Sequence, residues 1–491
     1  MRRRLAMLLP LGALTACSLA PAYQRPTPAI PAALPVAGQP DEPAPATLSY
    51  RDLVRDPRLV SLIERALANN QDLKAALANV ASARALVTVT RADLFPQLDG
   101  NAGVTTGDSS NETRGNVGNN GNNGAGGVGG GNGASTGGRR TTYSANLGVS
   151  WEIDLFGRLR SLNDAAFNQY LGTEAAQRAT RLSVVAGTAN AWLALAADRS
   201  LLAIARDTQA SAARSVELTQ ALLKGGVAPR TSLRQAETIL SQAEADQAAL
   251  ETAVAQDRNA LELVVGEPVS DDLLPASIES VDGALAEVPA GLDSSILLRR
   301  PDVVEREYQL RAANARIGAA RAAFFPRIGL TALAGFASSA LSSLFDHGAF
   351  TWSVAPSATL PIFDGGANLG NLRYSKAQRD LAVANYQRAI QSAFRDVSDA
   401  LARRATIDRQ LAASTRLDGA ARDSLFLANA RFREGIDPYL NLLDAQRTAY
   451  GAARTLTQTR LLKAQNLITL YQSLGGDALI DARPARDGGT R

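Results

Sequence analysis

Two proline-free segments are too long for any ordinary globular core. Residues 158–224 and 365–433 are rich in Ala, Leu, Gln and Arg, which favour helix, and no proline interrupts them. At about 1.5 Å of rise per residue, each segment predicts a single helix roughly 100 Å long. Such helices must pack on other long helices. In the second segment a coiled-coil spacing is given by Ile390, Phe394, Val397 and Leu401.

Each long segment is followed by the same turn, which indicates two copies of one structural unit. The motif LLKGGVAPRTSLRQAE (222–237) recurs as RFREGIDPYLNLLDAQ (431–446), with matching glycine and proline positions. Gly435 suits the left-handed residue after a helix, and Asp437 followed by Pro438 suits the N-cap and first position of the next helix. In each copy we therefore expect a helix to end, turn tightly and restart.

Alternating apolar and polar residues predict two strands in each copy. The clearest alternation covers 142–154, where Tyr143, Leu147 and Trp151 share one face, and 350–362 repeats it. We expect strands at about 94–105, 141–154, 324–336 and 350–362.

These strands are close to the ~9–11 residues that a tilted strand needs to cross a bilayer. Open sheet edges cannot face lipid, and one chain has too few strands to close a barrel, so closure requires other subunits. A soluble β-sandwich is the alternative.

The start of the sequence predicts export and lipid attachment. A basic Arg2–Arg4 region, a short apolar run and small residues precede Cys17, so we expect a lipoprotein signal peptide over 1–16 and acylation at Cys17. An ordinary secreted protein with an incidental cysteine is the alternative. Residues 17–55, rich in Pro and Ala towards their start, suggest a tether.

Composition argues against several classes of function. The chain has one His (His347) and one Cys, so it lacks the ligand clusters of a transition-metal site, and we expect neither an enzyme nor a metal site. Basic and acidic residues alternate along the helices, which indicates solvated faces rather than a nucleic-acid-binding patch. After the signal, no apolar stretch reaches the ~18 residues that a membrane-spanning helix needs.

The predicted organisation is as follows. The first repeat, 56–265, contains a helix, two strands, the helix 158–224 and a helix over 229–264. Its strands are separated by the Gly/Asn-rich segment 106–138, which has almost no apolar side chain and is expected to be a disordered loop. An irregular segment, 266–300, is expected to pack beside the middle of the helices. The second repeat, 301–474, has the same order with its last helix over 438–474, and 475–491 forms a tail.

This order, together with several separated motifs, resembles the outer-membrane factor family, the TolC/OprM-like exit ducts of tripartite efflux pumps. The motifs PAYQRP (21–26), LLRRPDVVEREYQLRAANARIGAARAAFFP (297–326) and YLNLLDAQR (439–447) are similar to the lipoprotein branch that works with RND-type pumps. The loop 106–138 is longer than usual for that family.

The resemblance implies an α+β membrane protein that forms a homotrimer, with a 12-stranded outer-membrane barrel continued by a periplasmic tunnel of 12 helices. It implies a passive, gated duct that carries small molecules such as drugs, with a periplasmic adaptor protein and an inner-membrane pump as partners. The only cofactor would be the lipid on Cys17. A periplasm-spanning structural lipoprotein and a protein-secretion duct are the alternatives.

The resemblance also assigns roles to the two turns. The periplasmic tips, which contact the adaptor, would be Gly225, Gly226, Val227, Gly435, Ile436 and Asp437. The gate would be Leu440 and Asp444, which lie on one helix face, with Thr231 and Gln235 at the matching first-repeat positions. A pair between Asp444 and Arg433 or Arg447 is the alternative.

Overall fold

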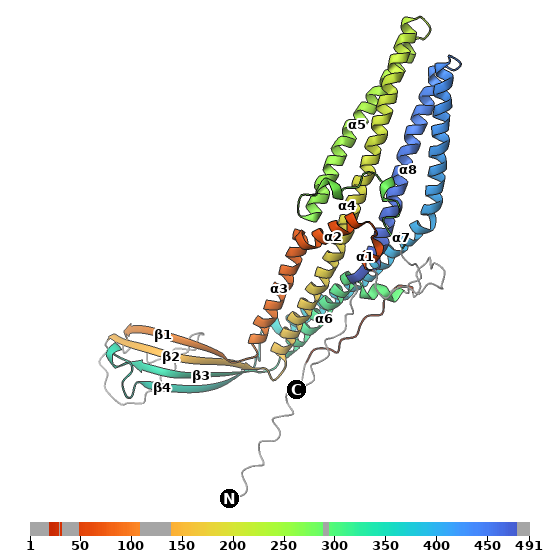
Figure 1. Ribbon diagram of the computed structural model, residues 1–491. Helices are drawn as coiled ribbons and strands as arrows, with labels where there is room; N and C mark the ends of the chain where they lie inside the picture. The colour runs from red at the N-terminus through yellow and green to blue at the C-terminus, as the bar shows by residue number, and fades with distance from the viewer. Residues whose placement is uncertain (1–18, 29, 32–48, 109–138, 288–293, 479–491) are drawn as a thin grey trace. The chain divides into compact units, whose positions relative to one another are not determined.

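The computed structural model describes residues 19–28, 30–31, 49–108, 139–287 and 294–478 (Figure 1). The first half contains α1 (Tyr50–Leu53), α2 (Pro57–Asn69), α3 (Gln71–Ala92), β1 (Gln97–Asp108), β2 (Arg139–Ile153), α4 (Arg158–Lys224) and α5 (Arg230–Val265). The second contains α6 (Pro301–Ala322), β3 (Arg327–Ser338), β4 (Phe350–Thr359), α7 (Ala367–Arg433) and α8 (Tyr439–Ser473). Short 3₁₀ turns are η2 (Asp271–Leu273), η3 (Glu279–Val281), η4 (Ser294–Arg299), η5 (Leu341–Ser343) and η6 (Gly476–Ala478).

Several predicted features lie outside the described residues. These are the signal peptide 1–16, Cys17, most of the loop 106–138 and the tail beyond residue 478.

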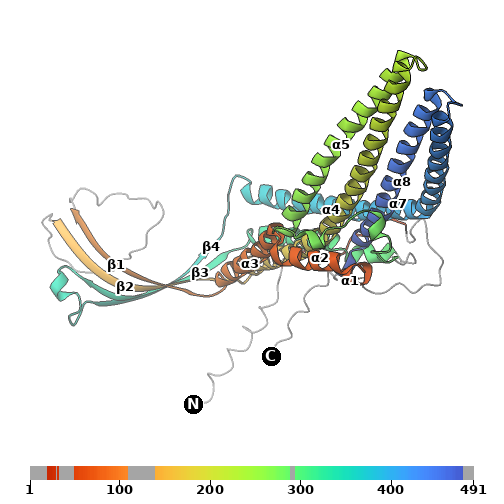
Figure 2. The ribbon, with the colours of Figure 1, turned by 45° about the horizontal axis from the view of Figure 1, so that its top comes forward.

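The long helices agree closely with the sequence pattern. α4 and α7 are each 67 residues long, and α4 has the predicted bounds. α4 pairs with α5 and α7 with α8, each pair forming a hairpin (Figures 1 and 2). Of the expected coiled-coil positions, Ile390, Val397 and Leu401 are buried and Phe394 is half-buried.

The helical pattern after Asp56 is two helices, not the single one that its periodicity predicted. Asn70 lies between α2 and α3 with an extended ψ of 130°, and its side chain accepts from the Leu73 amide at 2.9 Å and donates to the Val264 carbonyl at 2.8 Å. The first bond caps the N-terminus of α3, and the second ties the break to the end of α5.

Two strands begin later than their alternation suggested. Phe95 and Phe325 belong to the turns that end α3 and α6, since their amides bond to the carbonyls of Ala92 and Ala322 at 3.0 Å. The proline after each phenylalanine has no N–H to give to a ladder, so pairing starts beyond it. β4 ends at Thr359 instead of residue 362 because Thr359 pairs with Arg327, the first residue of β3.

The described chain forms two compact units that do not follow the two repeats. Of the described residues, one unit contains those within 19–23, 85–167 and 312–378, with all four strands, and the other contains those within 24–84, 168–311 and 379–478. Each unit therefore draws on both repeats.

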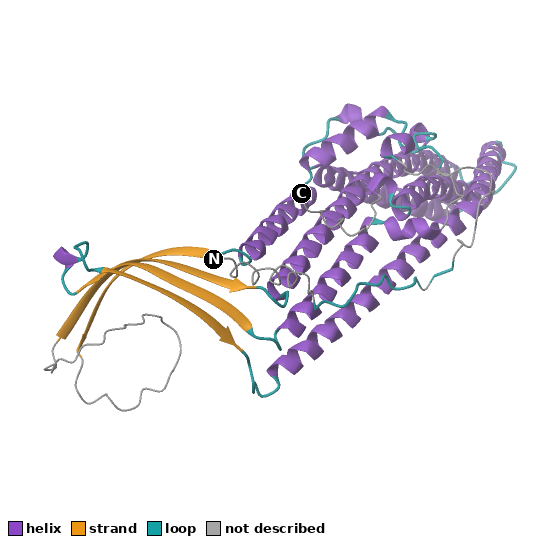
Figure 3. Cartoon of the chain, turned by 90° about the horizontal axis from the view of Figure 1, so that it is seen from below, coloured by secondary structure: helices purple, strands orange, loops and turns teal. Residues whose placement is uncertain are grey.

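The first unit is built on one antiparallel sheet of order β1-β2-β3-β4 (Figure 3). The registers of neighbouring strands align apolar residues with apolar residues, and polar or small residues with one another. Leu98, Val149, Ala332 and Val354 form one apolar row, and Asn101, Asn146, Gly335 and Thr351 form a row on the other face. The alternation within each strand thus gives the whole sheet one apolar face and one face of mostly polar or small residues. Among the described strands, β1 and β4 are the edges without a second neighbour.

The beginning of the described chain is extended, as expected of a tether, but it is held against α6. In the first unit, Asn314 donates to the Pro21 carbonyl at 2.7 Å and Arg321 to the Leu19 carbonyl at 3.0 Å. A Cβ at Gly318 would lie 2.8 Å from Ala20, so only glycine lets the segment approach this closely.

In the second unit, Arg25 bonds at 2.5 Å to Glu307, which is fully buried and also 2.8 Å from Arg311. The predicted tether also ends early. Residues 50–53 form α1, which a Ser49–Asp52 capping box starts and which buries Tyr50 and Leu53.

The irregular segment after α5 packs beside the middle of α4, as expected. Trp192 donates to the Leu273 carbonyl at 3.0 Å, Arg199 donates to the Pro275 carbonyl at 2.7 Å, and Ser200 donates to Glu279 at 2.9 Å. These bonds hold residues 273–279 against α4 within the second unit.

Among the residues that the structure describes, no helix combines the length and the apolar character needed to cross a membrane.

Candidate functional site: the two helix–turn–helix tips

Both tips end their first helix with the same backbone hydrogen bonds. After α4, the Val227 amide bonds to the Leu222 carbonyl at 2.9 Å and the Gly226 amide to the Leu223 carbonyl at 3.0 Å. After α7, Ile436 bonds to Arg431 at 2.9 Å and Gly435 to Phe432 at 3.1 Å. This is the Schellman arrangement, which satisfies the last carbonyls of a helix.

One glycine in each tip is required by its backbone. Gly226 has a φ of +73° and Gly435 a φ of +71°, and no atom lies within 4 Å of where a Cβ would be. The left-handed conformation, not lack of space, therefore selects glycine at these positions. Gly225 does not have a positive φ, so the turn does not need a glycine there.

The second tip carries an ion pair that the sequence did not predict. Arg431 holds Asp437 with two hydrogen bonds, Nε to Oδ2 at 2.6 Å and Nη2 to Oδ1 at 2.9 Å. This hydrogen bonding keeps the pKa of Asp437 below its ordinary value. The matching first-tip residues are Leu222 and Ala228, which cannot form such a pair.

The prediction that Asp437 and Pro438 are N-cap and first helical residue was wrong. The N-cap is Pro438, with extended φ −69° and ψ 154°, and α8 begins at Tyr439. Asp437 lies one residue too early to cap, and its carboxylate is already engaged by Arg431. Pro229 is likewise the N-cap of α5, so both helices start without a side-chain cap.

Apolar side chains project from both tips. Val227 is 76% exposed and Ile436 is 62% exposed, and each directly follows the left-handed glycine. The two turns thus present an exposed aliphatic group at matching places.

Leu440 and Asp444 share the exposed face of α8. Leu440 is 58% exposed and Asp444 is exposed, whereas Tyr439, Leu442 and Leu443 on the other face are buried. Within the described part of the chain, Asp444 makes no ion pair, with Arg433, Arg447 or any other residue. Thr231 and Gln235 are also exposed, on α5.

The buried face of α8 joins the two hairpins. Near the tips, Phe432, Tyr439, Leu442 and Leu443 pack in one apolar cluster with Ala236 of α5. Farther along, Gln446 donates to Ser215 of α4 at 3.1 Å, and the Tyr450 hydroxyl donates to Asp246 of α5 at 2.8 Å. One hairpin therefore supports the tip of the other.

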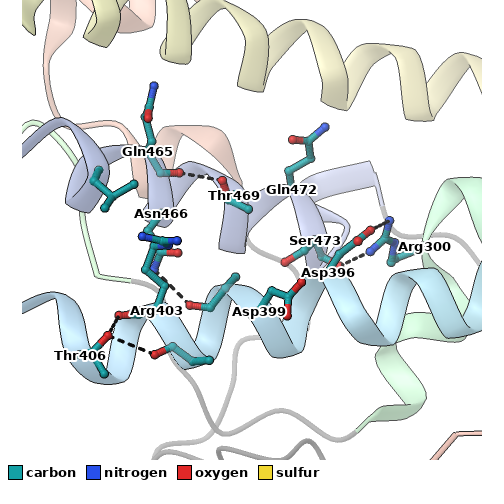
Figure 4. A pocket seen from close by; sticks show the side chains of 13 residues that line it. Arg300, Asp396, Asp399, Arg403, Thr406, Gln465, Asn466, Thr469, Gln472 and Ser473 are labelled. Atoms are coloured by element: carbon teal, nitrogen blue, oxygen red, sulfur yellow. Dashed lines mark hydrogen bonds and ion pairs between the residues drawn. The ribbon is translucent and has the colours of Figure 1, made fainter. Parts of the chain in front are cut away.

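A polar hollow of about 830 Å³ lies between α7 and α8, at the other end of α8 from its tip (Figure 4). Arg300 lines it, but its guanidinium is bound by Asp302 at 2.7 Å and by the Ser473 carbonyl at 2.9 Å. Because the chain satisfies this group itself, we assign the hollow no ligand. The described residues also contain no group of three or more side chains suited to hold a metal ion.

An open sheet with one apolar face, together with long helical hairpins, is the arrangement of an outer-membrane channel subunit. The sequence matches the family described as "Outer membrane efflux protein" over residues 62–267 and 292–476. It is 40% identical to the solvent efflux pump outer membrane protein SrpC of Pseudomonas putida, over 96% of each chain.

Solved structures with a similar fold support the same family. A crystal structure of CusC, 35% identical, has a TM-score of 0.79 and covers 94% of this chain and 100% of its own. The open-state MtrE outer membrane channel of Neisseria gonorrhoeae, 33% identical, has a TM-score of 0.78 and covers 95% of this chain and 100% of its own. The chain therefore belongs to the outer membrane efflux protein family.

Proposed function

We propose that the chain is one subunit of a homotrimeric outer-membrane duct, the exit of a tripartite efflux pump for small molecules. The observation that carries the proposal is the open sheet whose registers align apolar residues in rows on one face and mostly polar or small residues on the other. In lipid, the apolar face suits the outside of a barrel and the polar face suits a water-filled interior. A structural spacer has no use for the polar face.

The free edges support a closed ring of three chains. Strand edges are not stable in lipid, so β4 of one chain pairs with β1 of the next in our proposal. This contact is heterologous, and such contacts close when the rotation between subunits suits a ring. Three chains give 12 strands and, from the two hairpins in each, 12 tunnel helices.

The tips are the proposed contact with a periplasmic adaptor, which links the duct to an inner-membrane pump. Val227 and Ile436 support this role because they are exposed apolar groups on turns whose backbone is fixed. Relatives such as SrpC are named for solvent efflux, so we propose small apolar molecules as cargo and not proteins.

Leu440 and Asp444 are the proposed gate. A threefold axis beside the exposed face of α8 brings three copies of each side chain around the passage. Three unpaired carboxylates repel one another, so they do not serve stability, and charged rings in pores attract counter-ions. Leu440 narrows the same passage with apolar side chains.

Cys17 is the proposed lipid attachment site. Cys17→Ser should abolish labelling of the protein by radioactive palmitate, because no other cysteine exists in the chain. Labelling that persists in this variant would remove the lipoprotein assignment.

Native mass measurement and planar-bilayer recording of the purified protein test the duct. We expect a mass of three chains and a stepwise ion conductance upon insertion. A folded single chain that conducts would contradict the closure argument, and a trimer that never conducts would favour the structural lipoprotein.

A further inference from the structure

Two aromatic rings stack where the first repeat meets the second inside one chain, beside the junction of β2 and β3. Phe156 follows β2 and Phe325 precedes β3, and their ring centroids are 4.7 Å apart with an angle of 20° between the ring planes. The last paired residues of this ladder are Ile153 and Ile328. Each phenylalanine lies three residues beyond its isoleucine, so the two rings occupy opposite positions in a continuation of the same register.

The counterparts of these two rings lie at the two free edges of the sheet (Figure 1). The chain reads DLFG after β2 and PIFDG after β4, so Phe363 matches Phe156. It reads RAAFFP before β3 and RADLFP before β1, so Phe95 matches Phe325. Phe363 is 93% exposed and Phe95 is 56% exposed, and neither makes a ring contact within the described residues. Each edge therefore carries one half of an aromatic pair.

Placing these two rings opposite each other defines a register between β4 of one chain and β1 of the next. In this register Leu360 faces Leu98, as Ile153 faces Ile328 within one chain. Six apolar side chains that are at least half exposed in one chain become paired, namely Phe363 with Phe95, Leu360 with Leu98 and Val354 with Val104. The register thus continues the apolar face of the sheet across the edge.

The hydrogen-bonding groups at both edges fit the same register. The Ala337 amide donates to the Ala349 carbonyl at 2.9 Å, which identifies the hydrogen-bonded pairs between β3 and β4. Successive residues of a strand point these groups to opposite neighbours, so the registers extend this assignment over the whole sheet. Even-numbered residues then point outward on both β1 and β4, and this register pairs even with even. Pro356 offers only its carbonyl, as proline does at a sheet edge.

We propose that neighbouring subunits join in this register, with Phe363 of one chain stacked on Phe95 of the next. The contact between chains then repeats the one that Phe156 and Phe325 make within a chain. The sheet therefore passes from subunit to subunit in the way that it passes from repeat to repeat. This inference rests on the proposed ring of three chains, and it adds the register and the aromatic contact that fix the ring.

Disulfide trapping in the full-length, membrane-inserted protein tests the register. Ser357 and Asn101 face each other in it, on the face of mostly polar or small residues, and both are exposed in one chain. Theirs is a non-hydrogen-bonded pair, in which the Cα atoms lie about 4.5 Å apart, within the range that a disulfide spans. Ser357→Cys combined with Asn101→Cys should give covalently linked dimers and trimers on a denaturing gel without reductant. Each single variant, which retains Cys17, should run as a monomer.

Ser357→Cys combined with Asp99→Cys or with Gly103→Cys is the matched control. These partners lie two residues to either side on the same face, so their Cα atoms would be about 7–8 Å from that of residue 357, too far for a disulfide. Preferred linkage in a control pair would overturn the register, as would conducting trimers in which no pair links. A folded monomer by native mass measurement would instead overturn the ring itself.

The thermal stability of the trimer tests the aromatic contact. Phe363→Leu and Phe95→Leu should each lower the temperature at which the trimer dissociates in detergent. The double variant should lower it by less than the sum of the two shifts, because either change alone already removes the stack. Phe345→Leu is the control, since this exposed ring contacts Phe336 in the same chain, and its shift should add in full to that of Phe363→Leu. Additive shifts for Phe363 and Phe95 would overturn the contact.

Discussion

The two tips share one backbone and differ in their side chains. Both end a helix with the same pair of hydrogen bonds and a left-handed glycine, and both restart at a proline N-cap. Only the second has the Arg431–Asp437 pair, and only the second carries a carboxylate at the proposed gate position.

This difference distinguishes the features that form the turn from the residues that we assign a function there. The first tip forms the same turn without an ion pair, so the glycine and the helix-end hydrogen bonds are sufficient to form it. The charged residues of the second tip are therefore not needed to form the turn. We propose that they control the passage.

The largest expected effect comes from removing the proposed gate. Leu440→Ala combined with Asp444→Ala should raise the resting conductance of the trimer roughly twofold or more and reduce its preference for cations, because both rings are lost. Planar-bilayer recording measures both quantities.

The matched control is Thr231→Ala with Gln235→Ala, at the same positions of the first tip. It should change neither conductance nor ion preference. Equal effects of the two double variants would mean that the tips do not differ in function.

The next largest effect is expected from replacing the left-handed glycine that both turns share. Gly435→Ala and Gly226→Ala should each destabilise their turn by about 1–2 kcal/mol, since alanine is strained in the left-handed region. Amide hydrogen exchange at Ile436 and Val227 should accelerate roughly 5–30-fold.

Gly225→Ala is the control for these two variants, because Gly225 has no positive φ. It should leave exchange nearly unchanged. If all three glycines gave the same result, the left-handed conformation would not be what defines the turn.

A smaller effect is expected from the ion pair. Asp437→Asn should speed exchange of the Ile436 amide and leave the Val227 amide of the first tip unchanged, since only the second tip loses contacts. Limited proteolysis between residues 433 and 438 gives a second readout. An unaltered second tip would show that the pair contributes nothing to its order.

The same pair predicts a pH dependence. The pKa of Asp437 is lowered in the fold, so the stabilisation is fully present above the ordinary value of about 3.8 and is lost as the pH falls through the lower folded value. Exchange at the second tip should therefore be independent of pH near neutrality, after correction for intrinsic rates, and should rise only in strong acid. The Asp437→Asn variant should lack this rise.

Much of the fold could be predicted from local patterns. A run rich in helix-favouring Ala, Leu, Gln and Arg, ended by Gly225 and Gly226, predicts α4, and the alternation of residues predicts the two faces of the strands, because these features depend on neighbours in the chain. The glycines of the turns were predictable for the same reason. The strand starts were missed because Phe95 and Phe325 continue the alternation while the proline after each forbids pairing.

Contacts between distant segments could not be predicted. The bond from Tyr450 to Asp246 joins residues 204 positions apart, and that from Gln446 to Ser215 joins residues 231 apart. No spacing within either repeat indicates these pairs. Arg431 and Asp437 are different, since they flank a turn six residues apart, and opposite charges in that position could have indicated their pairing.

Cadmium block of variants with one introduced cysteine, in addition to the native Cys17, tests whether the second tip surrounds the passage. Three cysteines around a threefold axis offer thiolate ligands that hold a soft divalent ion in the path of the current. Asp444→Cys channels should lose most of their conductance when micromolar Cd²⁺ is added and recover with a chelator, whereas Gln235→Cys channels and the unmodified protein should be unaffected. An Asp444→Cys channel that conducts normally in Cd²⁺, or one blocked no more than Gln235→Cys, would contradict the assignment of the gate to the second tip.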